Sequence, residues 1–524
     1  GSQTPVRVQH GGRCVGESSG SAPRGFSRLA LCAFDGGERS VTFRRTSHRS
    51  LSPVQLNVNG EPSSPSAAAL PGHINPTRRL AGRVMVSNPD ARVTFCTAVS
   101  GHRRIFPSLA SPDEEFVDAT GVLHAPYSDG FDDGFNPAVH DAGTYRARAS
   151  AAGRETLSAV VARLATRGRP VTCMVYTFLV PWVPDVARAH GVPAALFWIQ
   201  PAAVFAVYYH YFHGHDVAIA ACANGLDPDA TVRLPGMPPL KPDALPSVVS
   251  ITSPEHRHHV VLDMVRELFL SLDEHKPRVL VNTLDALEPD ALRAVPQFEV
   301  DAVGPVVPDD VSPSSRADLL HCHDEKLYME WLETKPARSV VYVSFGTILL
   351  MSKRQEEEMR KGLEATGRPY LWVARKAGDG GASAGDGDGA QGMVVDWCDQ
   401  VRVLSHPAVG CFVTHCGWNS TLESVTRGVP MVAVPQWTDQ PTVAWLVDAC
   451  MGAGVRVRVD GEGLVERGEV QRCVEMVMGD GEAAAAIRAQ SDRWREVTRQ
   501  AVVRGGTSER NLRAFALGTP GSDA

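Results

Sequence analysis

The chain has 524 residues, of which 43% are hydrophobic and 21% are charged, and its formal net charge is −7. This length and hydrophobic content are sufficient for two sizeable cores, so we expect two domains. The negative charge and the lack of a Lys/Arg block argue against nucleic acid or an anionic membrane as a partner.

The cysteines and the apolar runs indicate the compartment. None of the eleven cysteines forms a CxxC pair, which is typical of free thiols in a reducing compartment. No apolar run approaches the roughly 18 residues that a membrane span needs. The first residues contain no hydrophobic core of a signal peptide. We therefore expect a cytoplasmic, monomeric protein.

The chain begins with a segment of biased composition. Residues 1–66 are rich in Ser, Gly, Pro and Arg, which predicts an irregular or disordered extension. Residues 70–76 then have the composition of a loop, and residues 77–84 have helical spacing. The first domain is expected to extend from residue 67 to residue 304.

From residue 93 onward, short apolar runs alternate with helical stretches, the pattern of a parallel α/β sheet. The expected strands of the first domain are 93–97, 172–176, 194–199, 279–283 and 298–303. Residues 204–215 are rich in Tyr, Phe and His and are expected to form one wall of a ligand pocket. His210, His213 and His215 could be metal ligands, but no carboxylate or Cys framework accompanies them, which favours pocket lining.

A segment of Pro, Asp and Ser, residues 305–320, predicts a linker, and a second α/β domain follows over residues 321–495. Its first strand, 339–345, ends in a glycine turn at Gly346 and Thr347. A Gly, Ala and Asp segment, residues 377–392, follows the next strand, 370–374. Residues 496–524 complete the chain with a helix and a tail.

The most informative stretch runs from Trp397 to Gln440. It predicts a strand over 410–414, a turn at His415-Cys416-Gly417 and a helix that starts at Trp418 and stops at Gly428. A strand, a glycine turn and a helix N-terminus form a site suited to phosphate. The two tryptophans could offer flat faces to a base and a sugar, although either one alone would more often be a core residue.

This stretch resembles the plant secondary-product glycosyltransferase box, the signature of plant family 1 UDP-glycosyltransferases. The order W, Q, H, WNS, E and DQ matches at every ligand position, and the length matches too, because 440 − 397 + 1 = 44 residues. The resemblance implies a GT-B fold, in which two Rossmann-like domains with parallel sheets face a central cleft. It also implies that the helix after residue 496 returns to the first domain.

The resemblance assigns donor-binding roles position by position. It implies that Trp397 stacks on uracil and that Gln400 and Glu423 hold the ribose. The diphosphate would be held by His415, Asn419 and Ser420, and the sugar by Trp418, Asp439 and Gln440. A closing Gln is associated in the family with glucose as the donor sugar. Further donor-site candidates are Cys398, Gly417, Gly346 and Thr347.

On the acceptor side, the resemblance implies that His73 is the catalytic base and that the pocket contains Trp198, Tyr208 and Tyr211. The family has a strand directly before the loop of this histidine, whereas residues 63–69 form no strand. Either residues 54–58 supply the first strand or the sheet lacks it. Thr177 stands where many members have an Asp that orients the histidine, and a hydroxyl can still hold an imidazole tautomer.

The Thr at this position favours an acceptor that needs little deprotonation. A carboxylic acid is already ionised at neutral pH, which predicts a glucose ester of an auxin-like or benzoic acid. A phenol or flavonoid hydroxyl is the next choice. Both fit the glucose-ester and 5-O-glucosyltransferase branch that the sequence resembles.

The resemblance implies inverting transfer in one displacement, with the leaving diphosphate stabilised by the helix N-terminus in place of a metal ion. We therefore expect UDP-glucose as co-substrate and neither metal nor cofactor. Asp386-Gly387-Asp388 formally matches a metal-binding DxD triplet, but its low-complexity surroundings predict a loop. Two alternatives stay open: a relative that binds UDP-sugar without a competent base, and a sugar-nucleotide epimerase of the same architecture.

Overall fold

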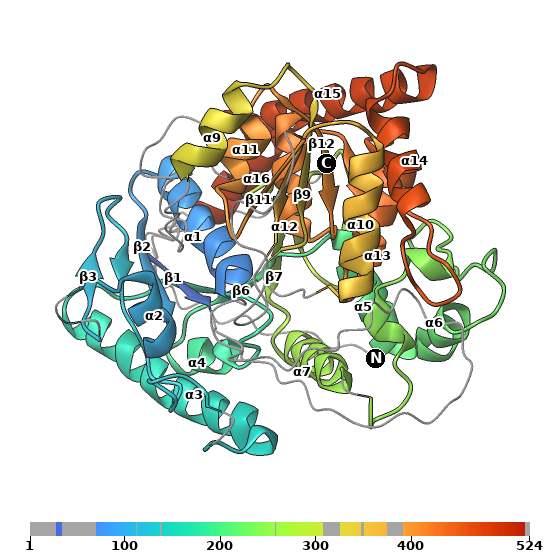
Figure 1. Cartoon of the computed structure of the whole chain (residues 1–524). Helices are drawn as coiled ribbons and strands as arrows, with labels where there is room; N and C mark the ends of the chain where they lie inside the picture. Colours follow the sequence, from blue (N-terminus) through green and yellow to red (C-terminus); the bar gives the residue numbers. More distant parts are fainter. Residues whose placement is uncertain are drawn as a thin grey trace, which may run out of the picture.

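A computed structural model describes residues 28–33, 70–109, 111, 113–136, 139–256, 258–307, 325–346, 351–374 and 391–518. Figure 1 shows two α/β units, with the blue to green elements in the lower part of the view and the yellow to red elements above them. Each unit is built around one mainly parallel sheet.

The first sheet has eight strands in the order β3-β4-β2-β1-β5-β6-β7-β8. All neighbouring strands are parallel except β3 and β4. The strands are β1 (Arg28–Ala33), β2 (Arg92–Thr97), β3 (Phe116–Val117), β4 (Leu123–His124), β5 (Cys173–Tyr176), β6 (Ala194–Trp198), β7 (Arg278–Val281) and β8 (Val300–Ala302).

The second sheet has six parallel strands in the order β11-β10-β9-β12-β13-β14. The strands are β9 (Val340–Ser344), β10 (Tyr370–Val373), β11 (Gly392–Val395), β12 (Val409–Thr414), β13 (Met431–Ala433) and β14 (Gly454–Arg456). Counted within the unit, this is the 3-2-1-4-5-6 order of a Rossmann fold, and β4-β2-β1-β5-β6-β7 repeats it in the first sheet. The predicted α/β fold with two Rossmann-like domains is therefore confirmed.

Helices connect the strands of both sheets. In the first unit they are α1 (Leu70–Ser87), α2 (Val99–Ile105), α3 (Ala142–Thr166), α4 (Val183–Ala189), α5 (Ala202–His210), a kinked segment (Tyr211–His215), α6 (Asp216–Ala223), α7 (His259–His275) and α8 (Pro289–Arg293). In the second unit they are α9 (Glu325–Glu333), α10 (Lys353–Ala365), α11 (Gln400–Ser405), α12 (Trp418–Arg427), α13 (Gln440–Trp445), a π-helical segment (Leu446–Cys450), α14 (Arg467–Met478), α15 (Glu482–Val502) and α16 (Thr507–Ala516).

The first strand of the first sheet corrects the prediction from sequence. β1 lies between β2 and β5, with Leu29 opposite both Val93 and Cys173. The strand is therefore neither missing nor supplied by residues 54–58, which lie outside the described residues. The reason is that a parallel strand needs only a short apolar run, here RLALCA, and its connection to the next helix can be much longer than the usual tight turn.

Helix α1 also differs from the prediction, because it begins at Leu70 and includes the expected loop over 70–76. Pro76 lies within the helix and has no N–H, so the carbonyl of Gly72 lacks its usual intrahelical donor. Asn419 fills this place, since its Nδ2 donates to the Gly72 carbonyl oxygen at 2.8 Å. His73 is therefore held in the first turn of a helix.

The last helix links the two units, and the segment that leaves the first unit is anchored within that unit. Leu512 and Phe515 of α16 are buried in a cluster with Ile74 and Leu80 of α1, so the last helix packs on the first unit. Figure 1 shows α16 beside α1. The Arg83 guanidinium donates to the carbonyl of Val303 at 2.7 Å, next to the segment where the chain leaves the first unit.

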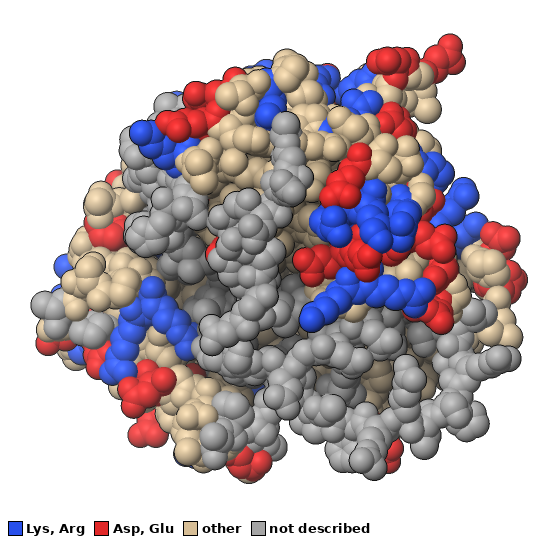
Figure 2. All heavy atoms as spheres, viewed as in Figure 1, with Lys and Arg blue, Asp and Glu red and all other residues tan. Residues whose placement is uncertain are grey.

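Charged side chains of both signs are interspersed on the face in Figure 2. Some of the charged side chains form ion pairs, among them Arg354 with Glu462 at 2.6 Å and Arg467 with Glu358 at 2.5 Å. Among the described helices, none is long and apolar enough to cross a membrane.

Candidate active site

The predicted phosphate site lies where the strand order of the second sheet reverses, at the ends of β9 and β12. Ligands of open α/β sheets bind at such a switch point. Gly346 follows β9 with φ +73°, and a Cβ there would lie 2.8 Å from Nε2 of His415. A Cβ at Gly417 would lie 2.5 Å from the same atom. The structure thus brings Gly346, His415 and Gly417 together, whereas Thr347 lies outside the described residues.

Helix α12 begins directly at this turn. Its N-cap is Gly417, which has no side chain to accept from the first N–H groups, so the helix N-terminus can bind an anion. Burial lowers the pKa of His415 to about 4, so its ring is neutral at pH 7. The positive end of the helix is therefore suited to an anion such as phosphate, and the neutral imidazole can offer a hydrogen bond.

The side chains predicted to hold the ribose form one hydrogen-bonded network. Nε2 of Gln400 donates to Oγ of Ser420 and to Oε2 of Glu423, both at 2.8 Å. The Tyr342 hydroxyl donates to Oε1 of Gln400 at 3.2 Å. Arg79 of the first unit approaches Oε1 of Glu423 at 3.2 Å. The sequence analysis missed Tyr342 and Arg79, because neither belongs to the 44-residue stretch.

Asp439 and Gln440 lie at the start of α13. Burial raises the pKa of Asp439 to about 6, and Oγ1 of Thr438 donates to its carboxylate at 2.9 Å. Oε1 of Gln440 accepts from the backbone N–H groups of Gln436 and Trp437, at 2.8 and 3.2 Å. The side-chain oxygen of Gln440 thereby holds the loop at residues 436–437 in place. The NH₂ group of the same side chain is the part that can donate to a ligand.

The three remaining side chains of the box have different environments. Trp397 is half-buried, and Cys398 is buried 3.3 Å from the Tyr342 hydroxyl. Trp418 is 3% exposed, and its indole N–H donates to the carbonyl of Asn282 at 2.7 Å. This corrects the expectation of an open face for the sugar, because the Trp418 ring packs in the core and joins the two units.

His73 lies in a largely apolar setting. Its ring meets that of Phe178 edge-on, with centroids 5.2 Å apart, and burial lowers its pKa to about 4. Within the described residues, neither Nδ1 of His73 nor Oγ1 of Thr177 has a hydrogen-bond partner. The expectation that Thr177 orients the imidazole is therefore wrong for this structure. The Thr side chain is shorter than that of Asp, and it is fully buried at the end of β5.

The aromatic residues predicted for the acceptor pocket are mostly core residues. Trp198 is fully buried and donates its indole N–H to the Pro201 carbonyl at 2.9 Å, and Tyr208 is 2% exposed. Of the three, Tyr211 alone is half-buried. For Tyr208 the physical reason is that every residue of α5 is buried, as expected of a helix that is apolar all round. Trp198 instead packs against Phe178, the neighbour of His73.

Of the three histidines in residues 204–215, His210 and His213 bond to protein groups, whereas Nδ1 of His215 has no hydrogen-bond partner among the described residues. His210 contacts the Pro235 carbonyl at 3.1 Å, and His213 contacts Asp273 at 3.0 Å. In the described part of the chain, one cluster could hold a metal by spacing, namely Asp185, Glu274 and His275. Arg188 pairs with both of its carboxylates, which makes the cluster an ion-pair network.

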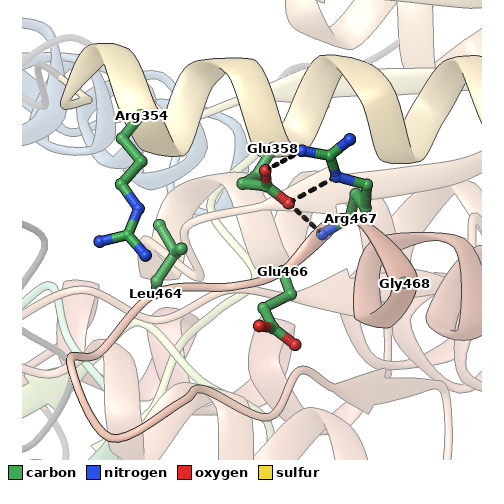
Figure 3. A pocket seen from close by; sticks show the side chains of 6 residues that line it. All are labelled: Arg354, Glu358, Leu464, Glu466, Arg467 and Gly468. Carbon is green, nitrogen blue, oxygen red and sulfur yellow. Dashed lines mark hydrogen bonds and ion pairs between the residues drawn. The ribbon is translucent and has the colours of Figure 1, made fainter.

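A pocket of about 320 Å³ lies beside α10 and the start of α14. Figure 3 shows the side chains that line it. It is lined by Arg354, Glu358, Leu464, Glu466, Arg467 and Gly468. None of the residues predicted for donor or acceptor lines it.

Comparisons with known proteins agree with this geometry. Residues 307–483 match the model of the family described as UDP-glucoronosyl and UDP-glucosyl transferase. UDP-glycosyltransferase 75C1 of Solanum lycopersicum is 43% identical over 459 residues, which cover 85% of this chain and 96% of that protein. Anthocyanidin 3-O-glucoside 5-O-glucosyltransferase 1 of Perilla frutescens is 41% identical over 459 residues, which cover 85% and 95%. The crystal structure of Os79 from O. sativa with UDP superposes with a TM-score of 0.71 at 29% identity, covering 94% of this chain and 99% of that one.

Fold, site and relatives together define a glycosyltransferase of the GT-B type that uses a UDP-sugar donor and a small-molecule acceptor. More specifically, the chain belongs to the plant family 1 UDP-glycosyltransferases, whose members are inverting and metal-independent. The chain is thus a UDP-glucose-dependent glucosyltransferase of small plant metabolites. The comparisons give no support to the impaired relative, and the premise of that alternative, a missing first strand, is removed by β1.

Proposed function

We propose that the chain forms glucose esters of a small plant carboxylic acid, and that a phenol or flavonoid hydroxyl is its second class of acceptor. The observation that carries the first choice is the setting of His73. Its pKa is lowered to about 4, and burial is the cause. A base this weak gains little by taking a proton from a hydroxyl of high pKa, whereas a carboxylic acid is already ionised.

The second acceptor class is favoured by one relative. The Perilla protein is named for glucosylation at the 5-O position of an anthocyanidin glucoside, and it is 41% identical to this chain. A phenolic hydroxyl needs the base more than a carboxylate does, so the two classes make different demands on His73.

A single acceptor can separate these classes. 4-Hydroxybenzoic acid carries both groups, and incubation with UDP-glucose followed by mass spectrometry identifies the product. We expect mainly an alkali-labile ester. His73→Ala should reduce ester formation by less than the roughly 10²-fold to 10⁴-fold loss expected of a phenol that needs general base catalysis. An alkali-stable product as the main species would contradict the ester proposal and favour the phenol.

The reaction chemistry needs no bound metal in this proposal. In this proposal the diphosphate binds at the N-terminus of α12, where the helix dipole and backbone N–H groups would stabilise the leaving group. Dialysis against EDTA should leave the rate unchanged, and a loss restored by Mg²⁺ would contradict this part.

We also propose a monomer in the cytosol that takes up no cofactor. The described cysteines are free thiols, and most of them are buried, which suits a reducing compartment. Light scattering of the purified protein and cell fractionation test these points. A stable dimer or a fluorescent fusion retained in a plastid would contradict them.

A further inference from the structure

Helices α1 and α12 touch at two points, and they carry the predicted base and the predicted donor-binding residues. Asn419 donates to the Gly72 carbonyl at 2.8 Å, and Arg79 pairs with Glu423 at 3.2 Å. Residues 72 and 79 are seven apart and share one face of α1, while 419 and 423 are four apart and share one face of α12. The contact therefore joins the two units helix to helix.

The Arg79–Glu423 pair is more than a surface ion pair. The two side chains are 17% and 10% exposed, so water screens the pair less than it would at the surface. The other oxygen of Glu423, Oε2, accepts from Gln400 at 2.8 Å. Each oxygen of the carboxylate thus accepts from a different donor, Oε2 from its own unit and Oε1 from the first unit.

We propose that Arg79 is a positioning residue of the donor site, which holds the Glu423 carboxylate in the orientation that receives the ribose hydroxyls. This inference rests on the donor site proposed above. A carboxylate offers about four acceptor positions, and Arg79 and Gln400 account for two of those of Glu423. Without Arg79, the Glu423 carboxylate can rotate more freely and becomes more hydrated. Binding of the ribose must then order and dehydrate this side chain, which weakens donor affinity.

The kinetic test compares Arg79→Ala and Arg79→Lys with a control, Arg78→Ala. Arg78 lies on the same helix, with its guanidinium over Phe106 at 5.9 Å. Arg79→Ala should raise KM for UDP-glucose about tenfold, as for a lost hydrogen bond to a charged group, while kcat and the acceptor KM change less than about twofold. Arg79→Lys should recover part of the loss, and Arg78→Ala should behave as wild type. An unchanged donor KM in Arg79→Ala would overturn the proposal.

A binding test separates action through the ribose from direct contact with phosphate. Calorimetry with UMP and with UDP should show the same fold loss in Arg79→Ala, because both nucleotides carry the ribose. A loss confined to UDP would mean that Arg79 binds the second phosphate, and it would overturn the proposal. Arg79→Gln, which keeps most of the side chain, reports the same quantity if Arg79→Ala fails to fold.

A double variant completes the test. If Arg79 acts through Glu423, Arg79→Ala has no further effect on UDP binding in a Glu423→Ala background. A further loss of more than about threefold there would contradict the proposal. Failure of the wild-type protein to bind UDP would instead overturn the donor site itself, so the two failures are distinguishable.

Discussion

At the scale of single residues, the proposed chemistry depends on two half-buried histidines that are neutral at pH 7. Burial lowers the pKa of both His73 and His415 to about 4. A base with this pKa is unprotonated over the whole neutral range, so its availability does not change between pH 5.5 and 8. The His73 ring is therefore unprotonated and able to accept a proton, but it is a weak base.

The pH profile tests this setting of His73. In Asp439→Asn, which removes the donor-site carboxyl whose pKa is raised to about 6, kcat/KM for UDP-glucose transfer should be flat from about pH 5.5 to 8 and should fall below about pH 5, because the free enzyme's base titrates near 4. Initial rates at subsaturating acceptor measure it, with stability checked at each pH. An acidic limb near pH 6.5 would show that the folded protein does not lower this pKa.

Gly346 is a second residue whose identity the structure explains. Gly346→Ala would place a Cβ 2.8 Å from the His415 ring at φ +73°, so we expect at least a tenfold loss of UDP affinity. Gly367→Ala is the matched control, since φ is +67° there and nothing lies within 4 Å of its Cβ. The control should lose only about 1 kcal/mol of stability and no affinity. Equal UDP affinity of the two variants in calorimetry would contradict the close approach to His415.

At the scale of elements, β1 is the strand on which the first sheet depends. It pairs with β2 on one side and with β5 on the other, so its loss would break the sheet in two. A chain that begins at residue 67 should be insoluble or lack cooperative unfolding, while one that begins at residue 26 retains β1 and should fold. Soluble yield and thermal unfolding by circular dichroism measure the difference. A folded, active chain from residue 67 would show that β1 is dispensable.

At the scale of the whole molecule, buried histidines make stability depend on pH. Within the described residues, neither ring nitrogen of His102 has a partner, and its pKa is lowered to about 4, mainly by burial. The folded state keeps this ring neutral, whereas the unfolded chain binds a proton below about pH 6.5. The stability is thus fully present above pH 6.5 and is lost as pH falls toward 4.

Thermal unfolding at pH 7.5 and pH 5 tests this dependence. Wild-type Tm should fall on acidification, and His102→Leu should reduce that fall by about 3 °C or more, because an apolar side chain replaces an unsatisfied one. Asp439, whose pKa is raised to about 6, changes stability in the opposite sense, so the difference between the two proteins is the informative quantity. Equal falls in both proteins would contradict the role of His102.

Much of the molecule was predictable from sequence because the signals were local. Strand runs such as 409–414 and the helix from Trp418 to Arg427 follow from apolar periodicity and glycine stops. The predictions that failed depended on partners far along the chain. Trp198 and Trp418 could have been surface platforms by composition, and only packing shows that both indoles are buried with their N–H groups bound to carbonyls.

The sequence alone determined the family and the two Rossmann-like units, and it predicted the donor residues from Trp397 to Gln440, because the spacing within one contiguous stretch can be read without knowledge of the fold. The tertiary structure decided which strand lies at the centre of the first sheet, where His73 is held, and that Arg79 meets Glu423. Each of these features brings together segments that are far apart in the sequence. Pairing across such separations depends on the whole packed chain, and no local pattern records it.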